Sequence, residues 1–100
     1  MPDDDIFAPP PFQPETALAT LRRTLRDLKL VEREGTWELK GKAIARTRAE
    51  GGALRLEVVK RPSTTPEWER AEASDHAQVR RFLDDLRRRL ARWEDARGDD

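Results

Sequence analysis

Residues 36–61 read TWELKGKAIARTRAEGGALRLEVVKR, and this stretch decides the fold. Two runs rich in aliphatic residues, TWELKGKAIARTR and ALRLEVVKR, flank the segment EGG. Gly51-Gly52 is typical of a two-residue hairpin turn, which joins antiparallel strands in a defined register. That register predicts the cross-strand pairs Arg48 with Arg55, Arg46 with Glu57 and Ile44 with Val59 on one face, and Ala49 with Leu54, Thr47 with Leu56 and Ala45 with Val58 on the other.

The two faces of this predicted hairpin differ in chemistry. The face that contains Ala45 is small and apolar, and Trp37 and Leu39 extend it, so we expect it to pack against helices. The opposite face combines cations with an Ile44–Val59 pair that we expect to be exposed, and Glu57 is its one acid. Its candidate partner-binding residues are Lys42, Ile44, Arg46, Arg48, Arg55, Val59 and Arg61.

The segment before the hairpin, PETALATLRRTLRDLKLVERE, predicts a helix that begins at Pro14. Proline suits the first helical turn, and Glu15 complements the positive end of the helix dipole. An apolar stripe follows from the spacing of Leu18, Leu21, Leu25 and Leu28. We expect the helix to end between Leu30 and Glu34. In an equally acceptable interpretation, these residues form a short third strand.

The segment after the hairpin begins with a loop, PSTTPE, and Thr65-Pro66-Glu67 predicts the first turn of a short helix that contains Trp68. The strongest element is SDHAQVRRFLDDLRRRLARWEDA, a long amphipathic helix. Asp75 and Gln78 resemble a capping box at its start. Its apolar stripe consists of Val79, Phe82, Leu83, Leu86, Leu90 and Trp93.

These elements predict the fold class α+β, with two layers: a helix, an antiparallel β-hairpin of two or three strands, and a long C-terminal helix. We place one small domain at residues 14–95, between a disordered acidic and proline-rich leader at residues 1–13 and a frayed tail at residues 96–100.

The leader has two interpretations. Its segment DDDIF resembles the acidic, phenylalanine-ended tail of bacterial single-stranded-DNA-binding proteins, and FAPPPF resembles the proline-rich ligands of small adaptor domains. Consecutive prolines favour the extended polyproline-II conformation, which binds with little ordering cost. Alternatively, Ile6, Phe7 or Phe12 lies on the core of the domain. We favour a disordered leader that binds nothing. If the leader does bind a partner, it is the second candidate contact surface, after the outer face of the hairpin.

Composition restricts the class of protein. The 20 basic and 20 acidic side chains cancel, but residues 35–62 carry seven basic and three acidic groups. Arginine makes up 16 of the basic residues, which suggests a GC-rich bacterial genome. Cysteine is absent, which excludes disulfide and thiolate chemistry. No apolar run approaches a membrane span or a signal peptide, so we expect a cytoplasmic protein.

Groups for catalysis are scarce, so we expect a protein that is not an enzyme and has no cofactor or metal. His76 is the only histidine, and no cysteine or second histidine shares a metal with it. The adjacent acids Asp84 and Asp85 point about 100° apart on a helix, rather than toward one site. The segment EGG lacks the spacing of a phosphate-binding loop.

Two functions remain. The first is a protein-interaction module that forms a homodimer or docks on a larger bacterial protein through the outer hairpin face, because a small sheet leaves unpaired edges and a small domain gains from extra buried surface. The alternative is nucleic-acid binding by the same arginines. The order of elements also resembles double-stranded-RNA-binding domains, although SDHAQVRR replaces their basic motif at the start of the last helix.

Overall fold

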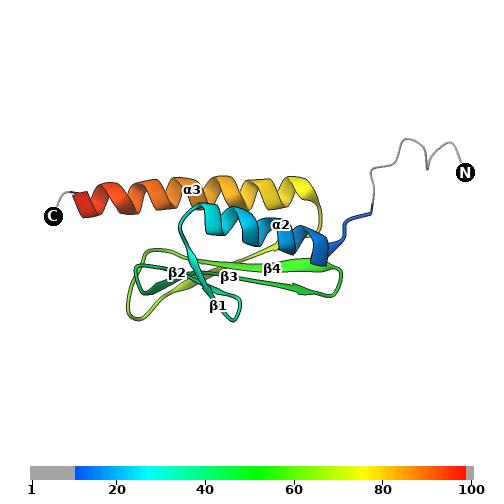
Figure 1. Ribbon diagram of the computed structural model, residues 1–100, viewed down its shortest axis with the longest axis horizontal. Coiled ribbons are helices and arrows are strands. Elements are labelled where there is room, and N and C mark those ends of the chain that lie inside the picture. The colour runs from blue at the N-terminus through cyan, green and yellow to red at the C-terminus, as the bar shows by residue number, and fades with distance from the viewer. Residues whose placement is uncertain (1–10, 99–100) are drawn as a thin grey trace, which may run out of the picture.

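The computed structural model describes residues 11–98, and its side chains through Glu94 (Figure 1). The elements in chain order are α2 (Pro14–Asp27), β1 (Val31–Arg33), β2 (Thr36–Leu39), β3 (Lys42–Glu50), β4 (Ala53–Val59), β5 (Trp68–Ala73) and α3 (His76–Gly98). Most of the predicted leader therefore lies outside the described residues, and α3 continues past residue 95, the predicted end of the domain.

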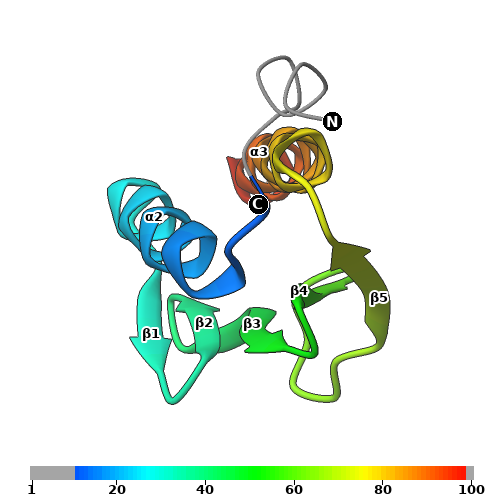
Figure 2. The ribbon, with the colours of Figure 1, turned by 90° about the vertical axis from the view of Figure 1, so that its right-hand side faces the viewer.

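The five strands form one antiparallel sheet in the order β1-β2-β3-β4-β5. Both helices lie on the same side of it (Figure 2): α2 packs over β3 and β4, and α3 packs over β5. The α+β prediction is confirmed. A hairpin of two or three strands understates the sheet, which has five strands.

Three tight turns connect β1 to β2, β2 to β3 and β3 to β4. The first two of these turns account for β1 and β2, which lie outside the central hairpin of β3 and β4. Glu34-Gly35, Lys40-Gly41 and Gly51-Gly52 each have positive φ at both residues, as a type I′ turn requires. The predicted Gly51-Gly52 turn is confirmed, and so is the alternative of a short strand before Gly35. The run TWELKGKAIARTR is two strands, β2 and β3, because the chain reverses at Lys40-Gly41.

The remaining strand, β5, corrects the prediction of a short helix at Trp68. Trp68, Arg70 and Glu72 point to one side of the sheet by strand alternation, and Glu69, Ala71 and Ala73 point to the other. Only pairing with β4 gives this segment a regular structure, because its alanines and charged residues are poor strand formers by themselves.

The predicted register of the central hairpin is confirmed from Ala45–Val58 to Glu50–Ala53. It does not continue to an exposed pair of Ile44 and Val59, since both residues are fully buried. Trp37 pairs with Ala45 and Glu38 pairs with Ala43, so Ile44 is an extra residue in β3 with no partner in β2. A β-bulge of this kind interrupts the strict alternation of side chains, and it lets Ile44 and Ala45 both reach the core.

The core lies between the sheet and the two helices. Leu21 and Leu25 of α2 and Leu86 of α3 are almost completely buried, and Leu18, Leu28 and the rest of the predicted α3 stripe lie in or against the same cluster. Phe12 also packs against this cluster, as one interpretation of the leader proposed, whereas Ile6 and Phe7 lie outside the described residues. The predicted apolar stripes therefore face the sheet.

Several polar groups inside and at the ends of this layer have hydrogen-bond partners. Trp37 Nε1 donates a hydrogen bond of 3.0 Å to Thr47 Oγ1, and Thr47 is the buried polar residue of the sheet. At the start of α3, Asp75 Oδ1 accepts a hydrogen bond of 2.8 Å from Gln78 N. Gln78 Oε1 accepts one from Ser74 N, one residue before the position expected in a capping box.

Candidate functional site

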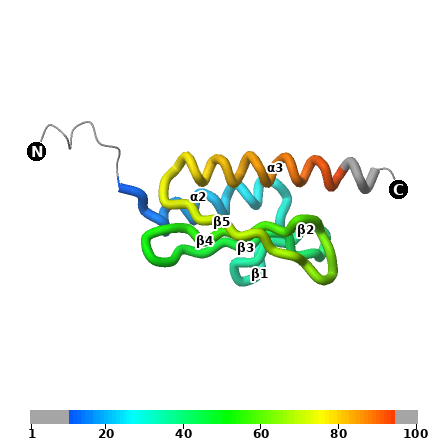
Figure 3. The backbone as a smooth tube through the Cα atoms, turned by 180° about the vertical axis from the view of Figure 1, so that it is seen from behind, coloured from blue at the N-terminus to red at the C-terminus, as the bar shows by residue number. Residues whose placement is uncertain are grey.

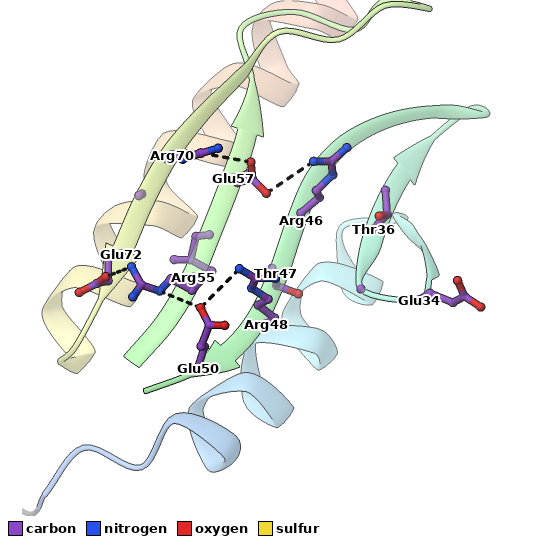
Figure 4. A pocket seen from close by; sticks show the side chains of 13 residues that line it. Glu34, Thr36, Arg46, Thr47, Arg48, Glu50, Arg55, Glu57, Arg70 and Glu72 are labelled. Atoms are coloured by element: carbon purple, nitrogen blue, oxygen red, sulfur yellow. Dashed lines mark hydrogen bonds and ion pairs between the residues drawn. The ribbon is translucent and has the colours of Figure 1, made fainter. Parts of the chain in front are cut away.

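The side of the sheet that faces away from α2 and α3, here called the outer face, contains the residues predicted to bind a partner. Its centre is a shallow depression of about 620 Å³, with walls from the β1–β2 turn and from β5 (Figure 4). The charged residues that line it come from the β1–β2 turn, β3, β4 and β5: Glu34, Arg46, Arg48, Glu50, Arg55, Glu57, Arg70 and Glu72.

Ion pairs connect most of these side chains across the strands (Figure 4). Glu57 on β4 lies 3.6 Å from Arg46 Nη1 and 3.9 Å from Arg70 Nε. Glu50 Oε1 lies 3.4 Å from Arg48 Nη2 and also 3.4 Å from Arg55 Nε. Arg55 also pairs with Glu72 on β5. Three of the four arginines are therefore held in place by glutamates from adjacent strands, and Arg48 by Glu50 of its own strand.

The charge of the outer face differs from the prediction. Four arginines and four glutamates line the depression, so its formal charge is 4 − 4 = 0. Glu57 is not the one acid of the group, because Glu50 ends β3 and Glu72 comes from the unexpected strand β5. A face of this composition is polar and balanced, not basic.

An aromatic side chain covers one end of the outer face. The Arg46 guanidinium carbon lies 4.0 Å from the centre of the Trp68 ring, as in a cation–π contact. Since β4 separates β3 from β5, this contact reaches across β4. Trp68 is also the cross-strand neighbour of Val59, which is fully buried although it follows the outer-facing Glu57 by two residues.

The structure separates the seven predicted partner-binding residues into three groups. Arg46, Arg48 and Arg55 come together on the outer face, whereas Ile44 and Val59 belong to the core. Lys42 and Arg61 are exposed at the end of the sheet that holds the β2–β3 turn and the β4–β5 loop (Figure 3). Within residues 11–94, neither of these two has an ion-pair partner.

Near the same end of the sheet, Arg89 of α3 ties the helix to two strands. It pairs with Glu69 on β5 at 2.6 Å and with Asp85 at 2.8 Å, and its Nη1 donates a 3.0 Å hydrogen bond to Val59 O. Partial burial lowers the pKa of Arg89, but the hydrogen bond and charge of Glu69 and the charge of Asp85 outweigh that effect, and the pKa is raised above its ordinary value. Arg89 therefore stays charged and serves as a structural clamp.

The described part of the chain brings together few groups for catalysis. No cluster of three or more His, Asp or Glu side chains in it is arranged to hold a metal ion. His76 lies edge-on to Phe12, with ring centres 5.2 Å apart. No helix among residues 11–98 is both long and apolar enough to cross a membrane.

The outer face includes functional candidates that sequence reasoning missed: Glu34, Glu50, Trp68, Arg70 and Glu72. Three of these residues lie on β5, where a helix was predicted. The alternation of large and charged residues with smaller ones in WERAEA is the available signal, but it is too short to distinguish a strand from a helix.

No protein family, curated protein or solved structure significantly matches this chain.

Proposed function

We propose that this protein is a non-enzymatic protein-interaction module and that the outer face of its sheet is the contact surface. The observation that supports this most is the ordered network of arginines and glutamates on a face that neither helix covers. A small domain needs only one buried face for its core, and here the second face carries its own cross-strand network.

The geometry of the network suits recognition of a polar protein surface. Arg48 and Arg55 share Glu50, and each guanidinium has five N–H donors, so donors remain for a partner. Because the glutamates already orient these side chains, docking loses less conformational entropy than it would with free arginines. The Arg46–Trp68 pair adds two of the three residue types that most often dominate protein interfaces.

The balanced charge favours a protein partner over nucleic acid. Binding to a phosphate backbone depends on cations that replace counterions, and the four arginines of the outer face already face four glutamates. Nucleic-acid binding remains the second candidate because Lys42 and Arg61 are exposed and have no ion-pair partner within residues 11–94.

Site-specific photo-crosslinking in the cells of origin tests the proposal. A benzophenone amino acid replaces Thr36, which lines the depression, or Thr20, which is exposed on α2 and serves as the matched control. We expect protease-sensitive, nuclease-resistant adducts from position 36, and at least about tenfold fewer from position 20.

Three outcomes would contradict the proposal: equal adducts at both positions, none at position 36 although the variant folds by circular dichroism, or adducts that nuclease removes. The last outcome would favour the nucleic-acid alternative.

A further inference from the structure

The β5 edge of the sheet is open to another strand. Trp68–Ala73 forms the last strand of the sheet, and no described element lies along its outer side (Figure 2). β1 at the opposite edge has only three residues, whereas β5 has six. An exposed edge carries unpaired N–H and C=O groups that can pair with a further strand.

The register identifies which backbone groups of β5 are free. Lys60 N donates to Glu67 O at 3.1 Å, which makes these residues a hydrogen-bonded pair next to the ladder. Such pairs alternate along antiparallel strands, so residues 69, 71 and 73 direct their backbone groups toward β4. The N–H and C=O groups of Trp68, Arg70 and Glu72 therefore point away from the sheet.

A second copy of this edge can pair with the free backbone groups of β5 in only a few registers. These registers differ in which charged side chains they bring together. In a two-fold antiparallel pairing, the outward-pointing residues 68, 70 and 72 must face one another. A two-fold axis at Glu69, Arg70 or Glu72 places that residue opposite its own copy, which brings like charges together. An axis at Trp68 leaves Arg70 and Glu72 opposite residues that precede the strand, one of them Pro66, which has no N–H. An axis at Ala71 places Arg70 opposite Glu72 of the partner subunit, twice by symmetry.

The exposure of these residues fits this register. The Arg70 side chain is 89% exposed and meets its one described acid, Glu57, only at 3.9 Å. Glu72 is half exposed. Ala71, which lies on the proposed axis, is exposed and small, so two edges can approach each other without a clash at the centre.

We infer that two copies of this chain join through β5 into a continuous ten-stranded antiparallel sheet, with the two-fold axis at Ala71. Charges on an edge strand usually prevent such pairing, but in this register they attract. The inference rests on the proposed interaction module and names one of its partners, a second copy. The edge lies beside the outer face, so the dimer also makes the two outer faces continuous.

Hydrogen exchange and sedimentation of the full chain provide the first test. We expect a dimer in sedimentation equilibrium. By NMR, amide exchange at Arg70 and Glu72 should slow with rising protein concentration. The amides of Glu69 and Ala71 bond within the monomer, so their exchange should show much less dependence on concentration. A monomer at millimolar concentration, or a dimer in which the amides of Arg70 and Glu72 remain unprotected, would overturn the inference.

A charge-swap series tests the register itself. Arg70→Glu makes both cross-strand pairs repulsive, and we expect dimer affinity to fall about tenfold or more. The double variant Arg70→Glu with Glu72→Arg should restore affinity to within about threefold, because each pair is again attractive. Arg23→Glu is the matched control, since Arg23 is exposed on α2 away from the edge, and this variant should remain dimeric.

The double variant distinguishes an interface from damage to the fold. It breaks the pairs of Arg70 with Glu57 and of Glu72 with Arg55 within one chain, so only pairing between chains explains a rescue. Failure of the rescue in a variant that folds by circular dichroism would exclude this register. If the protein is a monomer but still forms crosslinks at position 36, the dimer inference fails and the proposed interaction module remains, with a different partner. If the protein is a dimer but forms no crosslinks at position 36, only the proposed outer-face contact is refuted.

Discussion

The two faces of the sheet come from the same strands but have opposite chemistry. On the face beneath the helices, Leu54 and Leu56 of β4 are almost completely buried, and Thr47 is the buried polar residue. On the outer face, Arg55 and Glu57 of the same strand take part in an ion-pair network. Because successive side chains of a strand point to opposite faces, the apolar residues stabilise the fold on one face and the charged residues remain available for contacts on the other.

The largest expected effect concerns Ile44, which sequence alternation assigns to the outer face and the bulge brings into the core. Because Ile44 is fully buried, Ile44→Ala should lower the free energy of unfolding by about 2–5 kcal/mol. Urea denaturation measures this loss. Arg48→Ala is the outer-face control: its side chain is 70% exposed, and we expect a change within about 0.5 kcal/mol. Similar small effects from both substitutions would mean that Ile44 is not in the core.

An intermediate effect is expected at Thr47, the polar residue on the helix-covered face. Thr47→Val removes the acceptor of the Trp37 Nε1 hydrogen bond and leaves a buried N–H unpaired, which should reduce stability by about 1–3 kcal/mol. Thr47→Ser keeps the hydroxyl and should lose less. Thermal and urea unfolding compare the two variants, and a valine variant as stable as the wild type would show that this hydrogen bond contributes nothing.

The smallest effect is expected at Glu57, the acid shared by Arg46 and Arg70. Its ion pairs are partly exposed, so Glu57→Gln should reduce stability by less than about 1 kcal/mol. The loss should shrink further in 1 M NaCl, where the screening length falls to about 3 Å. Urea unfolding at low and high salt tests this. A large loss in the free energy of unfolding that salt does not change would show that the outer face contributes to stability as the core does.

Features that depend on neighbouring residues were predictable from the sequence. Gly51-Gly52 defined the register of β3 and β4 because a two-residue turn leaves one pairing. The stripe on α3 followed from helical spacing. The turn at Lys40-Gly41 was missed because Lys rarely adopts positive φ, so only the glycine signalled it.

The part of the candidate site on β5 was beyond reach for a different reason. Arg70, Glu72 and Trp68 join the outer face only because β5 pairs with β4, and WERAEA has no intrinsic preference for a strand. The burial of Ile44 depends on a bulge that forms where β2 and β3 meet. Neither feature can be inferred from one segment alone.

The sequence by itself determined the α+β class, the two amphipathic helices and the register of the central hairpin, because local spacing and turn chemistry specify them. The tertiary structure alone decided the fifth strand, the bulge at Ile44 and the balance of charge on the outer face. These features arise from backbone hydrogen bonds and ion pairs between separate segments, and such pairing outweighs the weak preferences of each segment.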